Sequence, residues 1–206
     1  AASLRTGRIL HIYCGIIWIS LNIILFQGGW NLMYFKDKYS NLFKKAIWGK
    51  IDSEFTMEIP EDDLISNVNI VPFINEKCVV IRLESGEWEI PGGTLEKDEK
   101  YGDTISRELI EEAGAILQTY VPFGAWKCFS HHVQAYKPHL PHPEFFRLVG
   151  YGNVEVSSNP LIPDDGEKVV AVEIMSVGEA AEKFKQKERP DLAELYMLAE
   201  ELRNQN

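Results

Sequence analysis

A glutamate-rich helix bracketed by glycines is the feature that most constrains this chain. The segment Pro91–Ala115 reads PGGTLEKDEKYGDTISRELIEEAGA. Ile105, Leu109 and Ala113 recur every four residues, which predicts a helix over about residues 100–113 with these apolar side chains in the core. One face of the helix is thereby fixed, and the rest of its surface must accommodate an unusual concentration of charge.

Three carboxylates share one side of this helix. Glu108 and Glu112 are four residues apart, and Glu111 is three residues from Glu108, so all three are neighbours on the helix surface. Arg107 can pair with Glu111, but one arginine does not balance three glutamates. Oxygen ligands suit a hard divalent cation such as Mg²⁺ or Mn²⁺. The spacing favours a cation site, whereas a glutamate pair alone is more typical of a solvated helix face.

The full spacing is far more specific than the glutamates alone. The matching residues are Gly93, Glu99, Arg107, Glu108, Leu109, Glu111, Glu112 and Gly114, in the pattern G-x5-E-x7-R-E-U-x-E-E-x-G-U, where U is bulky and apolar. This segment resembles the signature of the Nudix hydrolase family. Ala115 departs from it, because the last apolar residue is usually larger, and this affects packing rather than chemistry. The wider resemblance covers about residues 66–204.

The resemblance implies a fold and a reaction. The family has an α/β/α sandwich with a mixed β-sheet, and it cleaves nucleoside diphosphates linked to another moiety by water attack on phosphorus with Mg²⁺ or Mn²⁺. Glu111 and Glu112 match its main metal ligands, and Gly93 matches the residue whose carbonyl binds metal. Glu108 matches a further ligand or the group that activates water. Arg107, like Glu99, matches a residue that orients the glutamates.

A further catalytic glutamate is expected downstream, because many members of the family use one. Glu167, in the segment PDDGEKVV, is the first candidate, and Glu144 is the second. The alternative for each is a charge on a loop or on a strand surface.

Substrate selection is less constrained by the sequence. Trp126, Phe129 and Tyr136 could stack on a base, and the cations that could reach a phosphate are Lys127, Lys137 and Arg147. The histidines of the same region are His131, His132, His139 and His142. Their spacing matches no strong zinc pattern, which favours a polar loop bordering the cleft.

The remaining patterns predict a mixed α+β fold. The strand-like runs are 67–73, 77–83, 115–130, 144–156 and 167–175. Ser176 and Glu179 have capping-box spacing at the start of a helix. Asp191 is the expected cap of a final helix after Pro190.

Charge and cysteine content restrict the function and the compartment. Residues 1–60 carry 7 Lys/Arg and 4 Asp/Glu, net +3, whereas residues 61–206 carry 14 and 27, net −13. An acidic body disfavours nucleic acid as a partner, but not a small phosphate compound held through cations. The three cysteines have no C-x-x-C spacing, which disfavours a disulfide framework and fits a reducing, cytoplasmic compartment.

The N-terminal region is organised differently. Residues 9–26 contain no Asp, Glu, Lys or Arg, and as a helix they would span about 27 Å, close to a bilayer core. Three interpretations of residues 1–32 are open: a membrane anchor, a packed extension, or a leader foreign to the native protein. Residues 33–60 form a basic, aromatic extension, in which 41–51 suits a short helix or a strand on the main domain. Residues 61–206 are the expected Nudix domain.

The sequence therefore predicts a metal-dependent pyrophosphohydrolase acting on a small nucleotide-type substrate. Two other hypotheses are a nucleotide-sensing module that turns nothing over and an RNA 5′-pyrophosphohydrolase. The complete set of glutamates disfavours the first, and the acidic body disfavours the second. Membrane contact through residues 9–26 and a homodimer are open alternatives.

Overall fold

The structure is a computed structural model, and it describes residues 32–161 and 168–205. The chain divides into two units, residues 1–38 and residues 39–206. Residues 32–38 of the first unit are helical. The apolar segment 9–26 lies outside the described residues, so its three interpretations stay predictions. No helix in the described part of the chain is both long and apolar enough to cross a bilayer.

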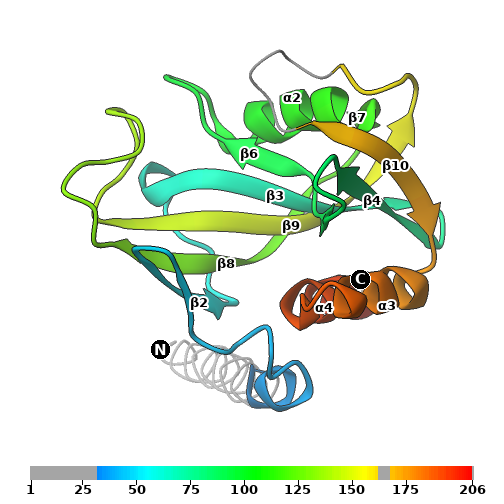
Figure 1. The fold of residues 1–206 in the computed structure, drawn as a ribbon, viewed down its shortest axis with the longest axis horizontal. Coiled ribbons are helices and arrows are strands. Elements are labelled where there is room, and N and C mark those ends of the chain that lie inside the picture. Colours follow the sequence, from blue (N-terminus) through cyan, green and yellow to red (C-terminus); the bar gives the residue numbers. More distant parts are fainter. Residues whose placement is uncertain (1–31, 162–167, 206) are drawn as a thin grey trace, which may run out of the picture. The chain divides into compact units, whose positions relative to one another are not determined.

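A mixed β-sheet forms the centre of the second unit (Figure 1). Along the sheet the order is β1-β2-β8-β9-β3-β4-β10. Three short strands lie off this path: β5 pairs with β4, β6 with β3 and β7 with β9. The strands are β1 (Ala46–Trp48), β2 (Ile51–Thr56), β3 (Ile65–Ile74), β4 (Lys77–Leu83), β5 (Trp88–Glu89), β6 (Gly92–Thr94), β7 (Ala115–Leu117), β8 (Val121–Ser130), β9 (Glu144–Val156) and β10 (Val169–Met175). β3 and β9 run parallel, and the other pairs are antiparallel.

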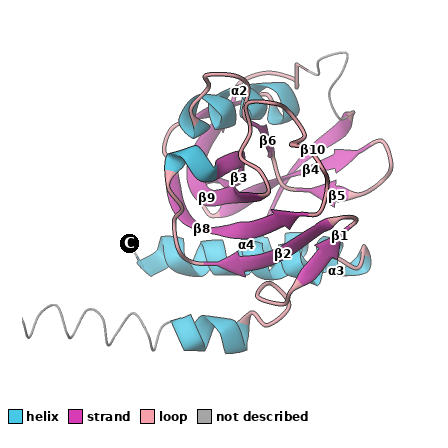
Figure 2. Ribbon diagram, turned by 90° about the vertical axis from the view of Figure 1, so that its left-hand side faces the viewer, coloured by secondary structure: helices cyan, strands magenta, loops and turns pink. Residues whose placement is uncertain are grey.

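Helices cover both faces of this sheet, as the views in Figures 1 and 2 show. Helix α2 (Tyr101–Ala113) lies on one side, and α3 (Val177–Gln186) and α4 (Pro190–Gln205) lie together on the other. A short 3-10 helix, Asp62–Leu64, precedes β3. The α/β/α sandwich with a mixed sheet is thus confirmed.

Helix α2 is anchored as its sequence predicts. Ile105, Leu109 and Ala113 are buried in one core cluster with apolar residues of β3, β4 and β9. Gly114 ends the helix in the left-handed conformation at φ 60° and ψ 30°, where a side chain would overlap the Ser158 carbonyl oxygen. This burial fixes the rotation of the helix about its axis and hence the direction of its carboxylates.

The sequence predicted the capping residues at the start of each of the last two helices, and one of the two predictions is confirmed. The capping box of Ser176 and Glu179 is confirmed at the start of α3. The expectation that Asp191 caps the last helix is wrong, because α4 already begins at Pro190, whose fixed φ suits a first helical position. Asp191 instead accepts a hydrogen bond from Arg189 Nε at 3.1 Å.

The extension before the Nudix-like segment is part of the sheet. Of the two alternatives for residues 41–51, the strand is found, since β1 pairs with β2 and β2 pairs with β8. The turn that precedes β1 is tied to the last helix, where Leu42 N donates to Glu194 Oε2 at 2.8 Å and Asn41 Nδ2 bonds to Glu194 Oε1.

Candidate active site

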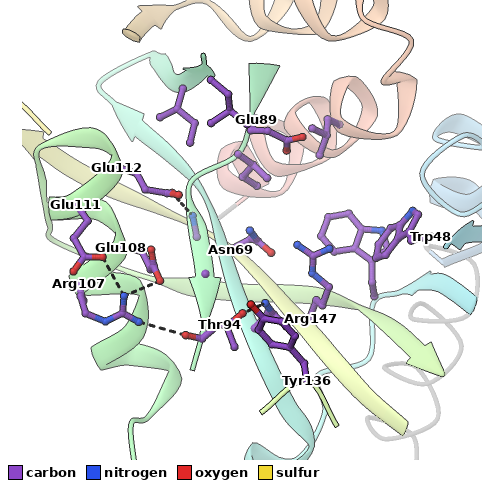
Figure 3. A pocket seen from close by; sticks show the side chains of 18 of the residues that line it. Trp48, Asn69, Glu89, Thr94, Arg107, Glu108, Glu111, Glu112, Tyr136 and Arg147 are labelled. Carbon is purple, nitrogen blue, oxygen red and sulfur yellow. Dashed lines mark hydrogen bonds and ion pairs between the residues drawn. The ribbon is translucent and has the colours of Figure 1, made fainter. Parts of the chain in front are cut away.

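The carboxylate face of α2 opens on a cavity of about 1060 Å³. Glu108, Glu111 and Glu112 line it from the helix, and Gly93 lines it from β6. The structure therefore brings together all four residues that the sequence identifies as candidate metal ligands. Figure 3 shows the three carboxylates on one side of this cavity.

Arg107 ties the loop before α2 to two of these glutamates. Its Nε and Nη2 donate to the two oxygens of Glu99 at 3.0 and 3.1 Å. Its Nη1 donates to Glu108 Oε1 at 2.8 Å and to Glu111 Oε2 at 3.2 Å. The pair of Arg107 with Glu111 is the i,i+4 interaction that the sequence predicts. One guanidinium thus sets the orientation of two carboxylates and restrains the preceding loop.

Glu99 holds the Arg107 guanidinium from the loop before α2. Burial alone would raise the pKa of Glu99, but hydrogen bonds from Arg107, the Glu96 backbone N–H and the Thr104 hydroxyl outweigh it and lower the pKa to about 2. Its carboxylate therefore stays ionised at neutral pH and holds the guanidinium in place.

The remaining two contacts join the helix to the glycine turn. The Glu108 carboxylate lies directly against Gly93, where a methyl group would overlap its Oε1 atom. Burial raises the pKa of Glu108, although the adjacent Arg107 acts in the opposite direction. Glu112 Oε2 accepts a hydrogen bond from the backbone N–H of Gly92 at 2.9 Å. Gly93 lets the strand approach the helix, whereas at Gly92 a side chain would overlap Val68 and Asn69 of β3.

These residues fit a divalent cation by their chemistry, since three carboxylates line one cavity together with Gly93. They are not already gathered as a cation shell, because the described residues contain no group of three acidic, histidine or cysteine side chains close enough to hold a metal. In this structure Glu108 and Glu111 face Arg107, and Glu112 faces Gly92. Cation binding would redirect these oxygens from their present donors.

A family model described as the NUDIX domain matches residues 63–197, well over half of the chain. The chain belongs to the Nudix family. It is accordingly a hydrolase acting on phosphorus-containing anhydrides. The matched segment contains α2 and the whole Nudix signature, and it begins after β1 and β2.

Comparisons with individual proteins add little to this assignment. A search of curated proteins found no match. A variant of the Bacillus subtilis pyrophosphohydrolase BsRppH is 14% identical, with TM-score 0.49, covering 64% of this chain and 77% of that chain. A NUDIX hydrolase from Nitrosomonas europaea is 20% identical, with TM-score 0.44, covering 58% and 77%. A structure described as ADP compounds hydrolase is 15% identical, with TM-score 0.46, covering 79% and 92%.

Of the two candidates for a downstream glutamate of the Nudix site, only Glu144 lies in the described part of the chain. Glu167 lies outside the described residues, so its role stays a prediction. Glu144 is exposed at the start of β9 and does not line the cavity. The cavity wall contains a different acidic pair instead, Glu89 and Asp191, and both are bound by Arg189.

Only some of the residues considered for substrate selection line the large cavity. Trp126, Tyr136, Lys137 and Arg147 line the large cavity, whereas Phe129 and Lys127 do not. The Lys137 ammonium pairs with Glu96 Oε1 at 2.6 Å, which ties the loop between β8 and β9 to the loop before α2.

Two residues of the Nudix site had no signal in the sequence. Asn69 is buried and lines the cavity, and its Oδ1 atom has no hydrogen-bond partner among the described residues. A buried amide oxygen of this kind is suited to accept a hydrogen bond from a ligand. Trp48 also lines the cavity, although it lies before the matched segment. Only the pairing of the strands, not sequence spacing, places these two on the same cavity as the carboxylates.

A second cavity, of about 480 Å³, adjoins the first. The residues that line both are Trp48, Asn67, Thr94, Tyr136 and Arg147. Of the four histidines in the sequence motif, His132 and His142 line this second cavity, which agrees with the prediction that the loop borders the cleft.

Proposed function

We propose that the protein hydrolyses a nucleoside diphosphate linked to another moiety, in a reaction that requires Mg²⁺ or Mn²⁺. The observation that carries this proposal is that Glu108, Glu111 and Glu112 line one cavity together with Gly93. A volume of about 1060 Å³ is at the upper end of the usual range for small-molecule sites. It offers room for a diphosphate and the groups attached on each side.

The bound cations would neutralise the pyrophosphate oxygens and the charge that develops during attack. Glu108, Glu111, Glu112 and the Gly93 carbonyl are the groups that would hold them. Arg107 acts as a positioning residue, because its contacts with Glu99 and Glu108 fix the helix face relative to the loop.

The reaction breaks one phosphorus–oxygen bond of the diphosphate bridge. A water oxygen forms a new bond to one phosphorus atom, the bridging oxygen leaves with the other phosphate, and the proton of the water passes to a carboxylate. Glu108 and Glu112 are the candidate acceptors, since both lie on the cavity side of α2. Glu167 is retained as a third candidate from the sequence.

The test is product analysis on a panel of phosphoanhydrides with Mg²⁺ or Mn²⁺. The panel contains nucleoside triphosphates, oxidised nucleotides, ADP-ribose, nucleotide sugars, dinucleoside polyphosphates and 5′-triphosphate RNA. Cation-dependent cleavage of one class by the wild-type protein, lost in Glu112→Gln, is the expected result. Binding of a nucleotide with no cleavage of any compound would favour the sensing module. Cleavage of the RNA alone would favour the RNA 5′-pyrophosphohydrolase.

A further inference from the structure

Trp48 reaches the active site from outside the segment that defines the family. It ends β1, and the family match begins at residue 63. β1 is the outermost strand of the sheet on this side, and it is joined to the family core through β2 and β8. The N-terminal extension therefore contributes a side chain to the cleft as well as two strands to the sheet.

Trp48 is on the same face of the sheet as Trp126. It is opposite Ile51 on β2, and Ile51 is opposite Ser130, four residues after Trp126 on β8. Trp126 on β8 is opposite Arg147 on β9, Arg147 is opposite Asn67 on β3, and Asn67 is opposite Thr94 on β6. Residues that are directly opposite each other across neighbouring strands project from the same face of a sheet. These four residues thus form one row that runs from β8 across β9 and β3 to β6, toward the carboxylates of α2.

The Trp48 ring is held in a defined position at the end of this row. The Arg147 guanidinium lies over it, 5.2 Å from the ring centroid, and Trp126 meets it edge to face, with centroids 6.2 Å apart. A guanidinium packed on an indole is a rigid, planar surface on which another flat ring can stack. Figure 3 shows this pair across the cavity from Glu108, Glu111 and Glu112.

Tyr136 lies close to this planar surface. It belongs to the loop between β8 and β9, it lines both cavities, and 85% of its surface is exposed. Trp48 and Arg147 line the same two cavities, and Figure 3 shows all three side chains. A tyrosine that is exposed to this extent has little role in the core, and it is available to cover a ligand resting on Arg147 and Trp48.

The second cavity has the chemistry of a site for an uncharged ring. Its lining, which lies entirely in the described part of the chain, contains no Asp, Glu or Lys, and Arg147 is its one arginine. The rest is aromatic or aliphatic, with two histidines, His132 and His142, and neutral polar groups such as Asn67 and Gln134. Arg147 disfavours a cationic ring such as oxidised nicotinamide, whereas a neutral nucleobase fits both the flat surface and the amide groups.

We propose that this second cavity holds the nucleobase of the substrate, stacked on the Trp48–Arg147 pair and covered by Tyr136. Trp48 is then a specificity-determining residue supplied by the N-terminal extension. The inference rests on the proposed function, because it places the diphosphate of the same substrate at the α2 carboxylates. The two cavities share five lining residues, so one substrate can extend across both.

Direct binding of uncleavable ligands tests this inference. Isothermal titration calorimetry would measure the dissociation constants of AMP, UMP, nicotinamide mononucleotide and ribose 5-phosphate. The wild-type protein should bind AMP or UMP at least about 10-fold more tightly than ribose 5-phosphate, since stacking contributes roughly that factor or more. Nicotinamide mononucleotide should bind more weakly than AMP.

Two variants and two matched controls locate the effect. Trp48→Ala and Tyr136→Ala should each weaken binding of the preferred nucleotide about 10-fold and leave ribose 5-phosphate unchanged. The controls are Ile47→Ala in the same strand and Val133→Ala in the same loop, which are 75% and 95% exposed and line neither cavity. Both controls should bind as the wild-type protein does. Because Tyr136 is exposed, its variant keeps the test valid even if Trp48→Ala does not fold.

The outcomes separate this inference from the proposed hydrolysis. Equal affinity for AMP, UMP and ribose 5-phosphate, or unchanged nucleotide binding in both variants, would overturn the base site. Tighter binding of nicotinamide mononucleotide than of either nucleotide would also overturn it. If base-dependent binding is lost in the variants while no diphosphate is cleaved, the base site stands and the hydrolase proposal fails. If diphosphates are cleaved with a KM that Trp48→Ala does not alter, only the base site fails.

Discussion

The Glu108 carboxylate occupies the space that a side chain at Gly93 would fill. The glycine of β6 and the glutamate of α2 are fifteen positions apart in sequence, and their contact sets how closely helix and strand approach. A second glutamate of the Nudix signature, Glu112, also faces this turn and accepts a hydrogen bond from the Gly92 N–H. The glycine pair therefore contacts two of the three α2 carboxylates as well as turning the chain.

Gly93→Ala should displace Glu108 from its present position. The added methyl group overlaps the Glu108 carboxylate, a flexible side chain, so the fold should persist while turnover falls by about 10-fold or more, the scale of losses when supporting contacts of a metal site are removed. Steady-state kinetics with Mg²⁺, together with thermal unfolding, would measure both effects.

Gly102→Ala is the matched control for this substitution. Gly102 lies in α2, and a methyl group there would meet nothing within 4 Å. Alanine favours a helix by about 1 kcal/mol relative to glycine, so this variant should be more stable and equally active. Wild-type turnover in Gly93→Ala would show that the position of Glu108 is not set by this contact.

The Glu99–Arg107 pair should make stability depend on acid pH. The pKa of Glu99 is lowered to about 2 in the folded chain, below the value of about 4.3 for an unfolded glutamate. The resulting stabilisation is complete above about pH 5 and is lost as the pH falls towards 2, and it amounts to at most about 3 kcal/mol.

Glu99→Gln isolates this contribution from that of the other carboxylates. Urea unfolding at intervals between pH 7 and pH 2.5, on protein without added cation, should show the variant less stable at neutral pH. The difference between variant and wild type should shrink as the solution is acidified. A difference that stays constant with pH would mean that the ionised carboxylate is not what stabilises the loop.

Mg²⁺ or Mn²⁺ should raise the melting temperature of the wild-type protein. A cation that binds only the folded state stabilises it by mass action, by about 2.7 kcal/mol at a concentration one hundred times its Kd. Glu111→Gln should reduce the increase, because it removes one anionic oxygen ligand from the cavity. Differential scanning fluorimetry in 0 to about 10 mM cation would measure it. Equal shifts in both proteins would argue for cation binding elsewhere.

The Nudix signature was predictable because it is local. The apolar spacing of Ile105, Leu109 and Ala113 fixes one helix face, and the glutamates follow on the other, so position in sequence determines position in space. The same locality explains the confirmed pair of Arg107 with Glu111, and the left-handed Gly114 at the end of the helix.

The opposite wall of the cleft was not predictable in this way. Trp48 and Asn69 come from separate strands, and only the pairing of β1, β2, β8, β9 and β3 places them on one cavity with Arg147, the cation that the sequence had proposed from residue type alone. No spacing along the chain encodes that register. The expected cap at Asp191 was wrong for a related reason, since Pro190 begins the helix and Arg189 binds the aspartate side chain.

Cation-dependent hydrolysis by Glu112→Gln tests the central claim most directly. Glutamine is nearly isosteric with glutamate and can still accept from the Gly92 N–H, so the variant should fold with a circular dichroism spectrum like that of the wild type. Its turnover of the preferred nucleoside diphosphate derivative with Mg²⁺ or Mn²⁺ should fall by on the order of 10²-fold or more. Undiminished turnover in this variant would contradict the assignment of the α2 carboxylates as the catalytic metal site.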